Sequence, residues 1–232
     1  MAKRHFDAVF IDFFGTVAAG DRAAVEATCR RIVDLLNLPI DARAFAIHWG
    51  EVFFATIEGS NHKGFRTLYE CELISLAATL KEYDVEADPA PLVAPLERYW
   101  RCPGLHPEAE EALRRIDLPT CCVSNADRRP LEQALEHHGF HFDEVICSED
   151  VRSYKPDPLI FEKALERMGA PADRVAHVGD SLHSDVGGAS KLGITTIWVC
   201  RDDRVHDIGK SKPDYMIRSL AELPAVLNSH AG

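Results

Sequence analysis

The sequence lacks the features that place a protein in a membrane or outside the cell. No apolar run approaches the roughly 20 residues that a helix needs to cross a bilayer. Residues 1–5 are basic, but the chain reaches Asp7 and Asp12 without the apolar stretch of a secretory signal. The seven cysteines form no C-x-x-C pair, which supports neither a disulfide framework nor a zinc site. We therefore expect a cytoplasmic protein without a membrane partner.

Basic residues are also scarce. The chain has 26 Lys and Arg against 37 Asp and Glu, a formal charge of −11. A surface of this sign repels nucleic-acid phosphates, so we expect no nucleic-acid partner and a small-molecule substrate instead. With 46% hydrophobic and 27% charged residues, the composition is that of a globular protein. Whether it is a monomer or a homodimer stays open.

The pattern of apolar residues changes along the chain. Residues 8–11 form a short apolar run ending at Asp12, which is typical of a buried parallel strand. From about residue 21 to residue 99 the apolar residues recur at helical spacing. Helix and strand signals then alternate, with strands expected at 121–123, 145–147, 175–178 and 195–199.

This alternation indicates βαβ units and a parallel sheet. We predict an α/β fold with a Rossmann-like core built from residues 1–16 and 103–232, and an inserted all-helical domain at 17–102. Ligands of such sheets bind beyond the C-terminal ends of the strands. The residues at four strand ends are Asp12, Ser124 with Asn125, the loop of Lys155, and Gly179 with Asp180.

Four segments with these residues resemble the motifs of the haloacid dehalogenase superfamily of aspartyl-nucleophile hydrolases. They are VFIDFFGT at 9–16, VSN at 123–125, KPDP at 155–158 and VGDSLHSD at 178–185. The resemblance runs from Phe6 to about Leu227, and the helical insertion resembles the small cap of that family. It implies a hydrolase whose reacting groups are these motif residues.

The resemblance implies a Mg²⁺ site. Asp12 is then the nucleophile, and it shares the metal with Asp180, Asp185 and the backbone carbonyl of Phe14. A carboxylate can attack a phosphoryl group only if the repulsion between two anions is cancelled, which a divalent cation and a lysine do together.

The other motif residues are expected to hold the transferring group. Lys155 would keep Asp12 and the phosphate in register as a cation. Thr16 and Ser124 offer hydroxyls, and Asn125 offers a backbone N–H.

Phe14 departs from the pattern of the phosphatases in this superfamily. Those enzymes usually carry a second aspartate at this position, which protonates the leaving oxygen and later activates water. Phenylalanine cannot transfer a proton, and such general acid–base help contributes about 10² to 10⁴ in rate. An alkoxide leaving group would therefore depart poorly.

Four functions are compatible with Phe14. We favour a Mg²⁺-dependent phosphatase with an aspartyl-phosphate intermediate, because the ligand set is intact. Its leaving group would be acidic, or the acid would come from one of the cap residues His48, Glu51, His62 and Lys63.

The second function is a 2-haloacid dehalogenase, since members with that activity have Tyr or Phe at position 14. Against it, they carry an arginine after the cap tryptophan, where this chain has Gly50 after Trp49. The third is phosphonoacetaldehyde hydrolysis, with Lys63 forming a Schiff base. The fourth is a weakly active or non-catalytic relative that binds a metabolite.

Other side chains are interpreted as structural. Asp127 is placed to cap the helix that follows it, and His177 reads as a core residue. Four aromatic residues are expected to pack the core of the helical insertion: Trp49, Phe53, Phe54 and Phe65.

Overall fold

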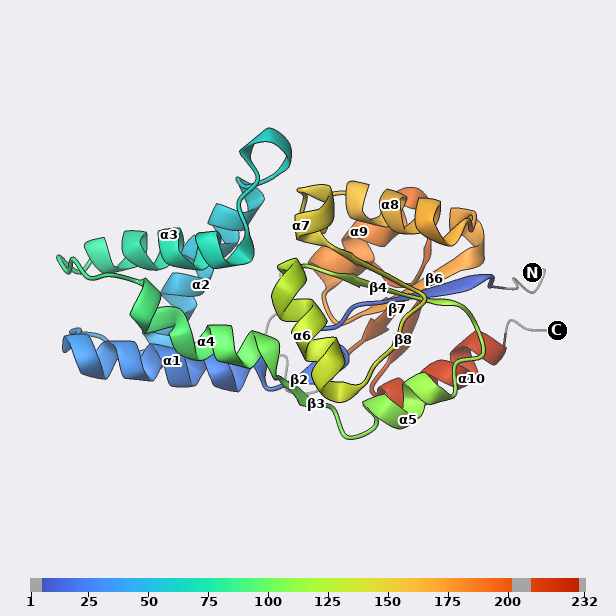
Figure 1. Ribbon diagram of the computed structural model, residues 1–232, viewed down its shortest axis with the longest axis horizontal. Coiled ribbons are helices and arrows are strands. Elements are labelled where there is room, and N and C mark those ends of the chain that lie inside the picture. Colours follow the sequence, from blue (N-terminus) through green and yellow to red (C-terminus); the bar gives the residue numbers. More distant parts are fainter. Residues whose placement is uncertain (1–5, 202–209, 230–232) are drawn as a thin grey trace.

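The computed structural model describes residues 6–201 and 210–229, so the basic residues 1–5 lie outside the described part. A six-stranded parallel sheet forms the core, in the order β5-β4-β1-β6-β7-β8 (Figure 1). Its strands are β1 (Ala8–Ile11), β4 (Thr120–Ser124), β5 (Glu144–Cys147), β6 (Val175–Gly179), β7 (Thr195–Val199) and β8 (Tyr215–Ile217). The predicted α/β fold class is confirmed.

Helices cover both faces of this sheet, which explains why its strands are apolar throughout. Val9 and Ile11 of β1 face a cluster with α5 (Ala109–Arg114), α6 (Arg128–His138) and α10 (Leu223–Asn228). Ala8 and Phe10 face the opposite cluster, with α8 (Leu159–Met168) and α9 (Gly187–Ala189). Figure 1 shows α8 and α9 on one side of the sheet, and α5 and α10 on the other.

Four further helices lie together beside the sheet (Figure 1), and we call them the helical block. They are α1 (Asp21–Leu36), α2 (Ala42–Glu58), α3 (Leu68–Lys81) and α4 (Ala90–Arg101). The block has its own apolar core, which includes Ile32, Phe45, Leu76 and Val93. The helix α3 begins with a capping box between Thr67 and Glu70.

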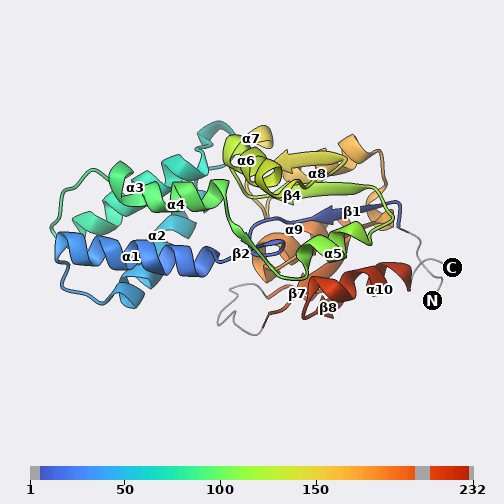
Figure 2. The same cartoon turned by 60° about the horizontal axis from the view of Figure 1, so that its bottom comes forward.

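The chain passes between the two parts at a short antiparallel pair, β2 (Ala18–Ala19) with β3 (Gly104–Leu105) (Figure 2). The Tyr99 hydroxyl of α4 donates to the Ala19 carbonyl at 3.0 Å, and this hydrogen bond links the block to β2. The proposed division into a core of 1–16 and 103–232 and a domain of 17–102 stays a prediction.

Two strand signals were too short to find in the sequence. The pair β2–β3 has two residues a strand, and β8 has three residues at the edge of the sheet with Met216 exposed. Among the described residues, no helix is both long and apolar enough to span a membrane.

Three interpretations of single side chains are wrong. Phe54 is exposed, and Phe65 stacks on Tyr154 of the core at 5.3 Å between ring centroids. Asp127 is the N-cap residue of α6, but its carboxylate accepts hydrogen bonds from the backbone of Leu68 and Tyr69. It therefore caps α3 and joins the block to the core.

Candidate active site

Six polar side chains converge beyond the C-terminal ends of β1, β4 and β6. Parallel strands end at the same edge of a sheet, so residues distant in sequence meet there. We call them the Asp12 cluster, and each is at most 5% exposed: Asp12, Thr16, Ser124, Lys155, Asp180 and Asp185. The structure thus brings together every predicted side-chain ligand of the metal and the predicted lysine.

Asp12 is held by three side chains. Its Oδ1 accepts hydrogen bonds from Lys155 Nζ at 2.8 Å and from Ser124 Oγ at 3.1 Å. Its Oδ2 accepts only from Thr16 Oγ1, at 2.9 Å, among the contacts that the structure gives this oxygen. The carboxylate is therefore fixed in orientation, with Oδ2 the less engaged of its two oxygens.

Lys155 lies between two carboxylates. Its Nζ is 2.8 Å from Asp12 Oδ1, 2.6 Å from Asp185 Oδ1 and 3.0 Å from the Val123 carbonyl. Burial disfavours the charge of Lys155, but the two carboxylates outweigh burial and raise its pKa. Burial alone would raise the pKa of Asp185, but Lys155 and His177 together outweigh burial and lower it. For Asp12 burial prevails over Lys155 and raises the pKa, with a further rise from Asp185.

The charges of the cluster fit a divalent cation. Asp12, Asp180 and Asp185 each offer one oxygen, and these oxygens lie within 4.8 Å of one another. With all three carboxyl groups ionised as metal ligands, they carry three negative charges against the one positive charge of Lys155. Carboxylate oxygens are the ligands that Mg²⁺ prefers. The donor set and the charge deficit together match Mg²⁺.

Gly15 makes room for this arrangement. It has a φ of +84°, and a Cβ built on it would lie 2.3 Å from Asp180 Oδ2. Any other residue would have both an unfavourable backbone conformation and a clash with this carboxylate. The glycine in the first motif is therefore needed to let Asp180 approach the loop after β1.

Asn125 holds the loop that carries Lys155. Its Oδ1 accepts the Lys155 backbone N–H at 2.7 Å, and its Nδ2 donates to the Lys155 carbonyl at 3.1 Å. No sequence pattern indicates this side-chain role. The proposed contact of its backbone N–H with substrate stays a prediction.

His177 is buried in β6, as expected of a core residue, but it also contacts the cluster. Its Nε2 is 3.0 Å from Asp185 Oδ1, and its ring packs on Phe161. The backbone N–H of Ser181 donates to the other oxygen of Asp185 at 3.0 Å. Asp185 is thus positioned by three groups, counting Lys155, and sequence spacing shows none of these contacts.

Phe14 links the nucleophile loop to the helical block. Its ring contacts Phe13 at 5.1 Å and Trp100 of α4 at 5.3 Å between centroids, both edge to face. The Trp100 indole N–H donates to Glu72 Oε1 of α3 at 2.8 Å. A row of aromatic rings therefore leads from the Asp12 loop to a buried carboxyl group of the block.

The structure places His48, one of the four cap residues considered as acids, away from this row. His48 contacts the Tyr83 hydroxyl at 2.9 Å and Glu82 at 3.0 Å, beyond the C-terminal end of α3. The 14 residues of α3 span about 21 Å from its core-anchored start, so His48 is too remote to serve as the acid. His62 pairs with Asp157 at 3.2 Å, while Glu51 and Lys63 are exposed.

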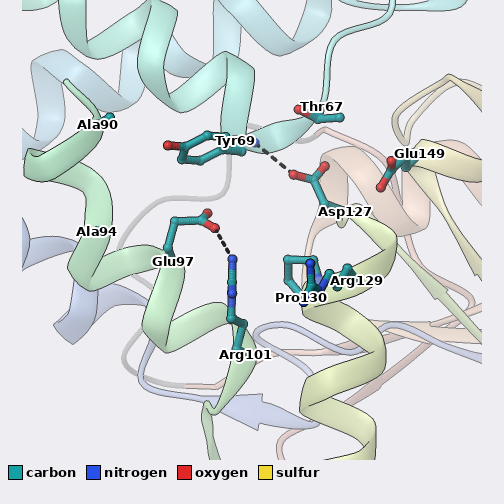
Figure 3. A pocket seen from close by; sticks show the side chains of 10 residues that line it. All are labelled: Thr67, Tyr69, Ala90, Ala94, Glu97, Arg101, Asp127, Arg129, Pro130 and Glu149. Atoms are coloured by element: carbon teal, nitrogen blue, oxygen red, sulfur yellow. Dashed lines mark hydrogen bonds and ion pairs between the residues drawn. The ribbon is translucent and has the colours of Figure 1, made fainter. Parts of the chain in front are cut away.

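A pocket of about 430 Å³ lies between α3, α4 and the start of α6 (Figure 3). Glu97 and Arg101 form an ion pair at 3.1 Å in its wall, and Asp127 reaches the backbone of Tyr69. No member of the Asp12 cluster is among its ten lining residues. The pocket therefore flanks the junction of block and core and is separate from the carboxylate cluster.

Comparison with known proteins agrees with this architecture. Residues 6–193 match the family model of haloacid dehalogenase-like hydrolases. The fold is similar to that of the magnesium-bound HAD-hydrolase YfnB from Bacillus subtilis, with a TM-score of 0.79 and 24% identity over 97% of this chain and 100% of that one.

Three curated relatives each match about half of the chain. Identity is 45% over 114 residues with the haloacid dehalogenase-like hydrolase domain-containing protein 3 of Danio rerio, covering 48% of this chain and 47% of that protein. It is 37% over 126 residues with a phosphoserine phosphatase of Thermus thermophilus, 51% and 49% of the two chains. The identity with the (S)-2-haloacid dehalogenase H-109 of Pseudomonas putida is 33% over 123 residues, which cover 51% of this chain and 54% of that protein.

The chain thus spans about half the length of these curated relatives. The family model, in contrast, covers most of the chain and includes all four motifs. The protein therefore belongs to the haloacid dehalogenase-like hydrolases, as its motifs predict.

Proposed function

We propose that the protein is a Mg²⁺-dependent phosphatase that hydrolyses a small phosphorylated metabolite through a phosphorylated Asp12. The observation that carries this proposal is the charge balance of the Asp12 cluster, in which three buried carboxylates face one buried lysine. A nucleophile for carbon–halogen cleavage needs no such excess of negative ligands, whereas transfer of an anionic phosphoryl group needs added positive charge.

Each residue of the cluster has a role in this proposal. Asp12, Asp180, Asp185 and the Phe14 carbonyl would hold Mg²⁺, which supplies positive charge to the phosphoryl oxygens when bound. Lys155 keeps Asp12 oriented and adds a fixed cation beside it.

The less engaged Oδ2 of Asp12 is the oxygen suited to attack phosphorus. The Asp12–phosphorus bond forms as the bond to the leaving oxygen breaks, and water later hydrolyses the aspartyl phosphate. Thr16 and Ser124 hold the carboxylate through this exchange with the hydroxyl groups that now contact it.

The helical block would act as the cap of this site. Its contacts with the core are specific: Asn61 Oδ1 accepts the Tyr154 backbone N–H at 2.8 Å, and the Tyr154 hydroxyl donates to the Arg66 carbonyl at 2.6 Å. Such a cover excludes water and selects the substrate by its shape. The phosphatase among the relatives is consistent with a phosphorylated substrate for this chain.

A haloacid dehalogenase is the second candidate, and Phe14 is the observation that favours it. A halide leaves as a stable anion, so no acid is needed at position 14, and one relative is a haloacid dehalogenase. Asp12 would then attack carbon. We rank this function second because it assigns no role to the negative charges of Asp180 and Asp185.

A substrate panel with and without Mg²⁺ tests the proposal. We expect turnover of aryl and acyl phosphates that requires Mg²⁺ and disappears in Asp12→Asn. Halide release from 2-haloacids without added metal would select the dehalogenase, and turnover of phosphonoacetaldehyde that depends on Lys63 would select the carbon–phosphorus hydrolase. A panel without turnover above the Asp12→Asn background would leave only a binding protein.

A further inference from the structure

Glu72 is a carboxyl group inside the helical block with an unsatisfied oxygen. Only 3% of the residue is exposed, and its Oε1 accepts the Trp100 indole N–H at 2.8 Å. Its Oε2 is buried too and has no hydrogen-bond partner among residues 6–201 and 210–229. Buried polar atoms are rarely left without a partner, because this is costly. Oε2 therefore has hydrogen-bonding capacity that the described residues leave unused.

Two sets of contacts place Glu72 on the core-facing part of the block. Trp100 joins it to Phe14, which is two residues after Asp12. From the other direction, Asp127 binds the backbone N–H groups of Leu68 and Tyr69, within about one helical turn of Glu72. Glu72 is thus linked to the nucleophile loop through the rings of Trp100 and Phe14, and it lies in the helix whose first residues bind Asp127.

The surroundings of Glu72 keep it protonated at neutral pH. Burial is the largest effect and raises its pKa to about 8, while the Trp100 N–H works in the opposite direction. The charged groups that face it are Glu97 on α4 and Asp127 ahead of α6, and both raise the pKa further. An acid whose pKa is close to the working pH can both deliver a proton and take it back.

We propose that Glu72 is the general acid that protonates the leaving oxygen, in place of the aspartate that position 14 lacks. This inference rests on the proposed phosphatase function and extends its substrates from phosphates of acidic groups to phosphate esters of alcohols. It assigns to the block a catalytic residue in addition to its role as a cover.

In this reaction Glu72 gives up one proton in the first step and regains one in the second. As Asp12 bonds to phosphorus, the bond from phosphorus to the ester oxygen breaks, and the Glu72 proton moves to that oxygen, which leaves as an alcohol. A water oxygen then bonds to phosphorus, the bond to Asp12 breaks, and one water proton returns to Glu72. Ester and water become alcohol and inorganic phosphate, and both carboxyl groups are restored.

The first test is the dependence of rate on the leaving group. Glu72→Gln keeps an oxygen for the Trp100 N–H but has no acidic proton. With Mg²⁺ and at a pH below 8, we expect kcat/KM for phenyl phosphate to fall by about 10² to 10⁴. The loss should shrink steadily along the series toward dinitrophenyl phosphate, whose phenol leaves without help. Glu26→Gln is the matched control, since it removes an exposed carboxylate of the block that pairs with Arg22 on α1, and it should leave the slope of the series unchanged.

Failure of this inference differs from failure of the proposed function. Equal slopes in wild type and Glu72→Gln would overturn the role of Glu72 and leave the phosphatase intact. A wild-type protein that turns over no phosphate above the Asp12→Asn background would overturn both.

The second test keeps Glu72 in place and moves its pKa. In wild type, kcat for phenyl phosphate should fall as the pH rises through about 8, because the acid form is lost. Trp100→Phe removes the N–H that lowers the pKa, so the falling limb should move to higher pH. A group that merely holds α3 to α4 would not shift this limb. A limb at the same pH in both proteins would show that Glu72 does not supply the proton.

Discussion

The Asp12 cluster and the Glu72 group both bury carboxyl groups, but they differ in how the charge is managed. In the core, Lys155 lies within 2.8 Å of Asp12 and 2.6 Å of Asp185, so the positive charge of the lysine stabilises the two carboxylates. In the helical block, Glu72 receives one indole N–H and retains its proton. The core is therefore suited to fixed charges, a nucleophile and metal ligands, while the block is suited to a proton that moves.

The largest effect should come from the nucleophile. Asp12→Asn keeps the shape and the Thr16 contact but loses the attacking carboxylate, so we expect kcat to fall by 10⁴-fold or more, on the order seen when a nucleophile is removed. Steady-state phosphatase assays with Mg²⁺ measure this. A loss of kcat no larger than that of Glu72→Gln would contradict the assignment of the nucleophile to the core and of only the acid to the block.

Removing the cation of the core should be the next largest effect. Lys155→Met leaves Asp12 and Asp185 buried without their ammonium, which costs about 3–5 kcal/mol of unfolding free energy. Urea unfolding without Mg²⁺ measures the loss. Lys163→Met is the control, because Lys163 forms an exposed pair with Glu166 and should cost under about 1 kcal/mol. Equal losses in the two variants would contradict the role of Lys155.

Gly15 allows a test of the metal site without changing a carboxylate. Gly15→Ala and Gly139→Ala both place a Cβ at positive φ, +84° and +65°, and each should cost about 1–2 kcal/mol for the backbone conformation alone. Only the Cβ at Gly15 meets Asp180, whereas no atom lies within 4 Å of the one at Gly139. Calorimetric titration should show Mg²⁺ affinity about 10- to 100-fold weaker in Gly15→Ala and unchanged in Gly139→Ala. Equal affinities would mean that Asp180 does not bind the metal.

The smallest expected effect concerns the joint between the two regions. Asp127→Ala removes an acceptor for the first backbone N–H groups of α3, in addition to the Thr67–Glu70 capping box, and Asp41→Ala removes the cap of α2 inside the block. Each should cost about 1 kcal/mol of stability. Of these two aspartates, Asp127 connects the block to the core and Asp41 does not, so KM should rise only in Asp127→Ala. A matching rise in Asp41→Ala would show that the cap of α3 has no special role in holding the block.

These two regions also differ in how far the sequence predicts them. Asp12 and Asp180 directly follow short apolar strands, Lys155 lies in the loop beyond another, and parallel strands bring their ends to one edge of the sheet. Local patterns therefore indicate where these residues meet. The contacts that orient them, such as Asn125 on the backbone of Lys155, depend on loop conformation and leave no pattern.

Glu72 could not be found in this way. It lies in a helix whose apolar residues indicate only packing, and its partner Trp100 is 28 residues away in another helix. The cap interaction of Asp127 with α3 likewise joins residues 58 and 59 positions apart. Such contacts arise from the packing of block against core, which a single sequence does not encode in any local spacing.

The most direct test of the account is to trap the covalent intermediate on the nucleophile. Wild-type protein turning over an aryl phosphate with Mg²⁺ would be quenched in acid, reduced with borohydride and mapped by peptide mass spectrometry. We expect reduction of the phosphorylated carboxyl to homoserine at position 12, dependent on both substrate and Mg²⁺. Modification at another carboxylate, or an unmodified Asp12 during steady turnover, would contradict it.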